Sequence, residues 1–216
     1  MGIEPNDFDE LIEGYRRFRR DGWSPQRARW AELAEGQSPK TMVIACSDSR
    51  VDPTQIFDVS PGEIFVVRNV ANLVPPFETT PGRHGVSAAL EFAVSVLEVG
   101  QIVVMGHGAC GGVKASLGRL FENAPPGQGG FIADWVGLID EARDAIEAQG
   151  LPPGDAVHAL ELACVKVSLA NLRTFPSIRA REQEGRLRLQ GAYFAIADGQ
   201  LHLLDEGSGS FSAVDG

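Results

Sequence analysis

The chain has 216 residues, of which 44% are hydrophobic and 22% are charged. This length is typical of one α/β domain and suffices to bury an apolar core without disulfide bridges. The formal net charge of -10 argues against nucleic acid or an anionic membrane surface as a partner. No apolar run approaches the ~20 residues of a membrane span, and the N-terminus lacks a secretory signal, so we expect a cytoplasmic protein without a membrane anchor.

Residues 1–36 are predicted to form a helical arm of two helices. The first helix begins at Asn6 or Asp7 and ends at Arg20, and the second is opened by Ser24-Pro25 and closed by Gly36. The arm is rich in arginine. Such a charge run is usually a solvated helix face, and the alternative is a docking surface for a second subunit. The arginines are Arg16, Arg17, Arg19, Arg20, Arg27 and Arg29.

From residue 41 the pattern changes to short apolar strands that alternate with helices. Strands are predicted at residues 42–45, 64–67 and 102–105, and a helix with a broad apolar stripe lies between the last two. Each strand runs into a loop of polar residues. This βαβ pattern indicates a parallel sheet, whose ligand site lies at the carboxyl ends of the strands.

The C-terminal part is predicted to be helical first and then to end in a hairpin. Residues 131–183 have mostly helical patterns, and the helix at 155–174 is apolar on more than one side, so it needs burial all round. Strands at 190–197 and 200–205 flank Asp198-Gly199, a strong turn signal. We expect a loose tail from Gly207 onward. The chain is therefore interpreted as one domain, 1–216, with its core at 41–206.

Two separated segments carry the residues of one zinc site. Cys46 follows the first strand, and His107 and Cys110 follow the third in a glycine-rich turn. Two thiolates and one imidazole form a catalytic zinc set with one coordination position free, because no fourth Cys or His accompanies them. The competing interpretation is two buried cysteines and a core histidine. It is disfavoured because no apolar helix face surrounds these residues, whereas Cys164 lies on such a face and is expected to be inert.

The spacing around Cys46 excludes other cysteine and zinc chemistry. Cysteine-dependent phosphatases place an arginine six positions after the nucleophile, but Arg50 is only four after Cys46. The zinc deaminase pattern H-x-E with P-C-x-x-C is absent. Asp48 and Arg50 lie on one side of an extended segment and can form a charge-assisted pair that orients a hydroxide beside the metal. The alternative is an ordinary surface ion pair.

The sequences CSDSR at 46–50, PGEIFVVRNVAN at 61–72 and HGACGG at 107–112 resemble the β-class carbonic anhydrases, and among them the plant-type branch. The resemblance implies an α/β fold with a central, mostly parallel sheet, an antiparallel edge strand, flanking helices and an N-terminal helical arm. It implies one Zn²⁺ per chain, reversible hydration of carbon dioxide to bicarbonate and a proton by zinc-bound hydroxide, and self-association as a dimer or tetramer.

The same resemblance assigns roles to individual residues. Asp48 and Arg50 become catalytic residues, and Asp48 can serve as a fourth zinc ligand when Arg50 releases it. Phe92 stands where the family usually has a pocket tyrosine, so the hydroxyl is missing. The substrate-binding positions are Gln37, Phe65, Val70, Phe92 and Gly111.

Two alternative functions remain open at this point. One is hydrolysis of carbon disulfide or a related small electrophile on the same scaffold, because fold and ligands do not fix the substrate. The other is a non-catalytic protein that binds zinc or bicarbonate. The proton shuttle is also open: His84 can act as one or can simply sit in a turn before a helix.

Overall fold

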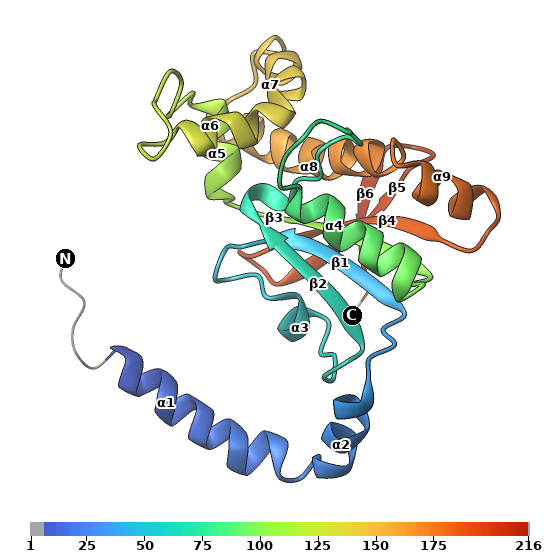
Figure 1. Ribbon diagram of the computed structural model, residues 1–216. Helices are drawn as coiled ribbons and strands as arrows, with labels where there is room; N and C mark the ends of the chain where they lie inside the picture. The colour runs from blue at the N-terminus through green and yellow to red at the C-terminus, as the bar shows by residue number, and fades with distance from the viewer. Residues whose placement is uncertain (1–6, 216) are drawn as a thin grey trace. The chain divides into compact units, whose positions relative to one another are not determined.

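The computed structural model describes residues 7–215, which fall into two compact units that divide between Ser38 and Pro39 (Figure 1). The first unit is the helical arm, and the second contains the sheet and the remaining helices. Within residues 7–215, no helix combines the length and the apolar character that crossing a bilayer requires.

The arm consists of α1 (Asp7–Arg17), a π-helical continuation η1 (Phe18–Trp23) and α2 (Arg27–Glu35). Both the predicted end of the first helix at Arg20 and the predicted start of the second at Ser24-Pro25 are wrong. The alternative start at Asn6 lies outside the described residues.

Ser24 explains this difference, because it closes the first helix and does not open the second. Its backbone N–H and its hydroxyl both donate to the carbonyl of Arg19, at 3.2 and 2.7 Å. A bond from residue 24 back to residue 19 has π-helical spacing, so the helix extends to Trp23. The guanidinium of Arg19 lies 4.2 Å from the centre of the Trp23 ring and supports this last turn.

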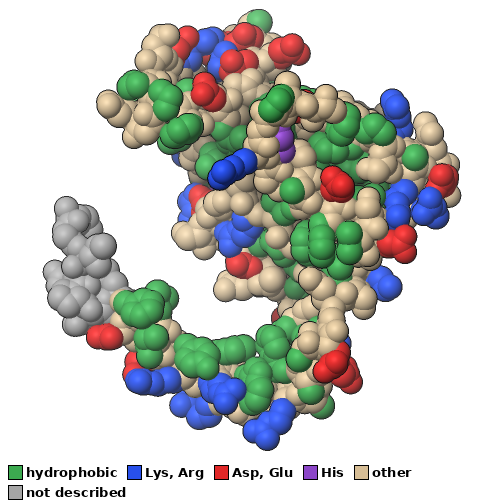
Figure 2. All heavy atoms as spheres, viewed as in Figure 1, with side chains coloured by type: hydrophobic (Ala, Val, Ile, Leu, Met, Phe, Trp, Pro, Cys, Tyr) green, Lys and Arg blue, Asp and Glu red, His purple; other side chains and the backbone are tan. Residues whose placement is uncertain are grey.

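One side of α1 and η1 is apolar and faces solvent within this unit (Figure 2). Phe8, Leu11, Tyr15 and Phe18 are 69%, 68%, 56% and 44% exposed. Their spacing of three, four and three residues places them on one stripe of the helix. A helix that exposes a continuous stripe of large apolar residues presents a surface for burial against a partner.

The second unit is built on a six-stranded sheet with the order β2-β1-β3-β4-β5-β6. The first four strands of this order are parallel, and β5 and β6 are antiparallel to their neighbours. The five predicted strands are present: the three at 42–45, 64–67 and 102–105 are longer than predicted, the one at 200–205 has the predicted bounds, and the one predicted at 190–197 begins and ends two residues earlier. The bounds of the strands are β1 Thr41–Cys46, β2 Ile64–Asn69, β3 Gln101–His107, β4 Arg188–Ala195, β5 Gln200–Asp205 and β6 Ser210–Ala213.

The predicted loose tail from Gly207 is wrong, because β6 pairs with β5 and adds a second antiparallel strand to that edge. Asp205 makes the connecting turn, since its carboxylate accepts hydrogen bonds from Gly207 N–H and the Ser208 hydroxyl, at 2.8 and 3.1 Å. Phe211 then packs against the hydrophobic core. The turn was missed because a carboxylate that accepts from its own backbone leaves no Asn-Gly or Asp-Gly signature.

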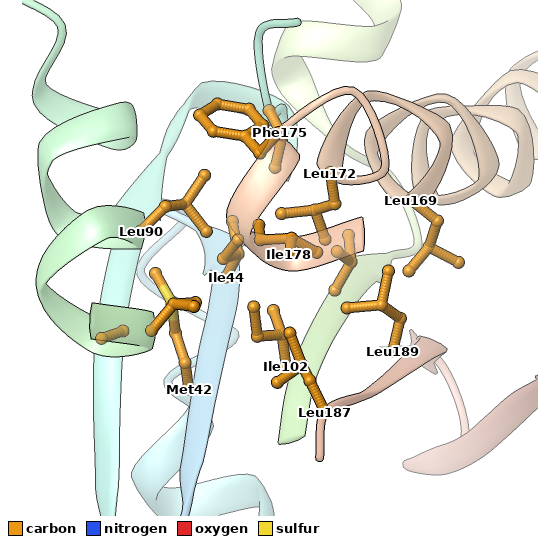
Figure 3. Packing of buried hydrophobic residues seen from close by; sticks show 14 of the residues in the cluster. Met42, Ile44, Leu90, Ile102, Leu169, Leu172, Phe175, Ile178, Leu187 and Leu189 are labelled. Atoms are coloured by element: carbon orange, nitrogen blue, oxygen red, sulfur yellow. The ribbon is translucent and has the colours of Figure 1, made fainter. Parts of the chain in front are cut away.

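Helices cover the sheet unevenly. Side chains from α4, η3, α8 and α9 pack on the face that contains Met42, Ile44 and Ile102 (Figure 3). The other face, with Val43 and Met105, contacts Ile56 of α3 and the following Phe57. The helical bounds are α3 Pro53–Ile56, η2 Val70–Asn72, α4 Gly85–Glu91, η3 Phe92–Val96, α5 Gly111–Leu117, α6 Gly130–Val136, η4 Gly137–Ile139, α7 Asp140–Glu147, α8 Pro153–Leu172 and α9 Pro176–Gln183.

Two glycines let α8 approach the sheet closely. A Cβ at Gly106 on β3 would lie 2.7 Å from a methyl group of Val165, and a Cβ at Gly191 on β4 would lie 2.9 Å from the other methyl group. Val165 is fully buried between the two strands. The prediction that this helix is buried all round is wrong, because Asp155, His158 and Lys166 are exposed. Its buried side packs on β3 and β4, and its position there is set by the contact of Val165 with the two glycines.

We expect Gly191→Ala to lower the free energy of unfolding by about 1–3 kcal/mol, because the new methyl group would overlap Val165 and the Leu204 side chain. Chemical denaturation measures this change. Gly154→Ala is the matched control: it lies in α8 with no heavy atom within 4 Å of the added Cβ, so its stability should be unchanged or higher. Equal stability of the two variants would contradict the close contact.

Candidate metal centre

Cys46, His107 and Cys110 come together at the carboxyl ends of β1 and β3. Cys46 is the last residue of β1, His107 is the last residue of β3, and Cys110 precedes α5. All three are buried, and one ligand atom from each lies within 4.8 Å of the others. In the described part of the chain, no other cluster of three such side chains has this geometry.

The backbone around the three ligands adopts conformations that are unusual for residues with side chains. Ala109 has φ = 57°, and Ala71, whose turn follows β2, has φ = 61°. Gly112 lies against this turn, because a Cβ there would be 2.6 Å from Val70 and 3.1 Å from the Ala71 side chain. Strained residues of this kind persist where the surroundings hold them, and here they allow α5 to begin beside Cys46.

His107 is oriented as a metal ligand. Its Nδ1 lies 2.9 Å from the carbonyl oxygen of Gly108, and a carbonyl only accepts, so Nδ1 carries the proton. Its Nε2 is buried and has no hydrogen-bond partner. A buried nitrogen lone pair without a donor is unfavourable by itself, and a metal ion satisfies it.

The two thiols also fit a zinc ion. The sulfur atoms of Cys46 and Cys110 are 4.0 Å apart. Two Zn–S bonds of ~2.3 Å at a tetrahedral angle give a separation of about 3.8 Å. The hydrogen bond from Cys110 lowers the pKa of Cys46 against the effect of burial, while the same interaction raises the pKa of Cys110. One thiol therefore ionises readily and the second needs a cation, which a zinc ion provides.

Asp48 and Arg50 form the predicted pair beside this cluster. Arg50 donates from Nε and a terminal nitrogen to the two oxygens of Asp48, at 2.9 and 2.7 Å, and its backbone N–H donates to the same carboxylate at 3.0 Å. These bonds hold the pKa of Asp48 well below its usual range. Arg50 also donates to the carbonyl of Ala109, at 3.2 Å, and so connects the two loops. Asp48 is not a member of the three-ligand cluster in this arrangement.

Arg68 fixes the backbone of the loop that carries Asp48. Its guanidinium donates to the carbonyls of Cys46 and Asp48, at 2.9 and 2.6 Å, and to the carboxylate of Asp52, at 3.0 Å. Arginine suits this task because its donors lie in a rigid plane. The loop is therefore held from one side by Arg68 and from the other by the bond from Arg50 to Ala109.

The structure separates the predicted substrate residues. Val70 packs at the start of α5, and a Cβ at Gly111 would meet no atom within 4 Å, so the space beside that residue is open. Phe65 and Phe92 stack on each other with ring centres 5.9 Å apart. Phe65 pairs with Met42, four positions before Cys46 on β1, a distance of about 13 Å along the strand.

Gln37 belongs to the arm unit and is exposed within the described chain. His84 interacts with Thr80 and Glu78 in the turn before α4, where its ring nitrogens lie 2.9 Å from the Thr80 carbonyl and 3.3 Å from the Glu78 carboxylate. The sequence left two roles open for His84, a proton shuttle or a residue of the turn before a helix. These contacts support the role in the turn.

Sequence reasoning missed three supporting side chains. Glu161 accepts a hydrogen bond from Cys110 N–H, Tyr193 donates to Glu161, and Ser168 bonds to the turn after β2 through Asn72 and Val74. The sequence does contain a signal for one of them, because Glu161 is an acidic residue within an otherwise apolar stretch of the predicted helix at 155–174. An acidic residue at a core position needs a partner, so Glu161 could have been singled out.

Comparison with known proteins agrees with this geometry. The carbonic anhydrase family model matches residues 41–201. A carbonic anhydrase from Pseudomonas aeruginosa is 39% identical over 206 residues, which cover 95% of this chain and 91% of that protein. Beta carbonic anhydrase 3 from Arabidopsis thaliana is 34% identical over 197 residues, 90% of this chain and 76% of that protein.

Solved structures show the same relationship. The β-carbonic anhydrase CcaA superposes with a TM-score of 0.87 at 33% identity, over 97% of this chain and 92% of that one. A tetrameric β-carbonic anhydrase from Sordaria macrospora superposes with a TM-score of 0.77 at 27% identity, over 96% of this chain and 100% of that one. The chain belongs to the β-carbonic anhydrase family. Its activity is the zinc-dependent, reversible hydration of carbon dioxide.

We expect Cys46→Ala to lose most of its zinc, because two ligands remain of three. Elemental mass spectrometry of the purified protein measures the metal content. Cys164→Ala is the matched control, since Cys164 is buried in the core and burial raises its pKa to about 12. This control should keep zinc near one ion per chain. Equal zinc content in both variants would contradict the assignment of Cys46.

Proposed function

We propose that Asp48 and Arg50 position the reacting groups during the hydration of carbon dioxide. When bound by Cys46, His107 and Cys110, a zinc ion supplies hydroxide near neutral pH by lowering the pKa of water. The ionised carboxylate of Asp48 would accept a hydrogen bond from that hydroxide and so orient it toward the carbon atom of the substrate. Arg50 keeps that carboxylate ionised and fixed.

One observation carries this proposal: a three-ligand cluster lies beside an acid whose two oxygens are both held by one arginine. Three protein ligands leave a coordination position for substrate chemistry, whereas a structural site closes with four. The release of Asp48 from Arg50, which would make it a fourth ligand, is part of the same proposal. It requires that the two bonds from Arg50 break first.

We expect Arg50→Ala to reduce the rate of carbon dioxide hydration about 10- to 100-fold while zinc remains bound, because the carboxylate loses its fixed orientation. Stopped-flow hydration assays and metal analysis on the same samples measure both effects. Arg186→Ala is the control, since Arg186 is exposed and pairs with Glu184 on the surface. Unchanged turnover in Arg50→Ala would refute the positioning role.

The stopped-flow assay also separates the alternative functions. A zinc-loaded native chain that turns over carbon disulfide and not carbon dioxide would belong to the hydrolase alternative. A loaded chain with neither activity would be a binding protein. No contact in the described residues favours either alternative over carbon dioxide hydration.

We propose that a second copy of the chain completes the predicted substrate pocket. We propose that Val70 and Gly111 line the pocket beside the ligands of their own chain. Phe65 lies too far along its strand to reach those ligands, and Phe92 of η3 stacks on Phe65. Phe92 is 42% exposed, so a second copy can cover it. For Gln37 the proposal rests on the family resemblance alone.

Self-association is supported by the apolar stripe of α1 and by the tetrameric Sordaria macrospora relative. We propose that a second copy buries Phe8, Leu11, Tyr15 and Phe18. A cytoplasmic location is proposed as well, because the thiols of Cys46 and Cys110 must stay reduced to bind metal.

The double variant Phe8→Glu with Leu11→Glu should dissociate into smaller species, because it places two charges on the stripe. Sedimentation analysis at several concentrations measures the mass. The control Asp9→Ala with Glu10→Ala changes neighbouring residues outside the stripe and should keep the native mass. An unchanged mass in the first variant would exclude the stripe as the interface.

A further inference from the structure

Glu161 is the buried acid of this structure. Its side chain is 3% exposed, and it is the one acidic residue that is buried among residues 8–215. An ionised carboxylate away from water is strongly unfavourable unless hydrogen bonds compensate it. No Lys or Arg pairs with it in the described chain; the nearest cationic candidate is His158, whose Nδ1 lies 3.8 Å away.

The two carboxylate oxygens of Glu161 accept hydrogen bonds from two different segments of the chain. Oε1 accepts a hydrogen bond from the backbone N–H of Cys110, at 3.0 Å. Oε2 accepts from the hydroxyl of Tyr193 on β4, also at 3.0 Å. Burial and the charge of Glu161 raise the pKa of Tyr193, so its hydroxyl keeps the proton that it donates. The carboxylate thus joins a zinc ligand to the neighbouring strand.

The position of Glu161 follows from the packing of α8. Glu161 precedes Val165 by one helical turn, so both lie on the same face of the helix. Val165 is fixed between Gly106 and Gly191. Gly106 directly precedes His107, so the same contact that places the helix also places the carboxylate over the turn from His107 to Cys110.

The turn itself needs this support. Ala109 has φ = 57°, a conformation that a residue with a side chain adopts at a cost, and Cys110 follows it directly. The tight fit extends to Gly108, where a Cβ would lie 3.1 Å from the Tyr193 hydroxyl oxygen. Glu161 and Tyr193 therefore both contact this turn: the Tyr193 hydroxyl lies against Gly108, and the Glu161 carboxylate accepts the hydrogen bond from Cys110 N–H.

We propose that Glu161 is a positioning residue that fixes the direction of the Cys110 thiolate and so sets the zinc affinity and the ligand geometry of this site, with Tyr193 holding the carboxylate in place. The proposal rests on the zinc site and not on the roles of Asp48 and Arg50. An ordinary structural role, in which Glu161 merely satisfies a buried N–H, would change stability without changing the metal.

The test is zinc affinity, measured by competition with a chromogenic chelator, together with the thiolate-to-metal absorption of the cobalt-substituted full-length protein. Glu161→Gln keeps the shape of the side chain, but its amide nitrogen is a donor and faces one of the two donors at the site. We expect zinc to bind about 10- to 100-fold more weakly, with a changed cobalt spectrum. Tyr193→Phe removes one of the two hydrogen bonds to Glu161, together with the contact between its hydroxyl and His158 Nδ1, and should give a smaller change in the same direction.

Asp155→Asn is the matched control, because Asp155 lies on the same helix and is exposed. It should leave the zinc affinity and the cobalt spectrum unchanged. Native zinc affinity and a native spectrum in Glu161→Gln would overturn the proposal, even if the zinc-free protein melts at a lower temperature. If Glu161→Gln does not fold, the zinc affinity and the cobalt spectrum of Tyr193→Phe test the proposal instead. Native values of both in Tyr193→Phe would then overturn the proposal. Neither measurement involves turnover, so failure here is distinct from failure of the Asp48 and Arg50 proposal.

Discussion

The close contact of α8 with β3 and β4 is the constraint on which the metal centre depends. Val165 occupies the space that side chains at Gly106 and Gly191 would fill, so the helix axis has one position over the sheet. From that position Glu161 reaches the turn after β3, and Ser168 reaches the turn after β2. Two loops that are distant in sequence are thereby held by one rigid helix.

Charge is balanced within the centre by short-range contacts. Two thiols 4.0 Å apart cannot both ionise without a cation, while Arg50 and Arg68 hold the neighbouring loop through Asp48, Asp52 and backbone carbonyls. The protein thus separates two tasks. Cysteine and histidine form the cluster that can hold zinc, and arginine fixes the acid that we propose acts on substrate, without competing for the metal.

Much of the fold was predictable because local patterns encode it. The five predicted strands, at 42–45, 64–67 and 102–105 and in the C-terminal hairpin, were recognised from apolar runs and turn residues. Two of the errors share one cause. Ser24 closes a π-helical turn and Asp205 builds the turn before β6, and in both cases a side chain satisfies backbone groups in a way that composition does not reveal.

The sequence alone determined the chemistry of the site, because Cys46, His107 and Cys110 are identified by residue type and by their place after predicted strands. The tertiary structure decided which other residues serve that chemistry. Glu161 is 51 residues from Cys110, and Phe65 is separated from the ligands by the length of a strand. Such relations depend on how helices and strands pack, and packing is set by contacts between distant residues that no local pattern records.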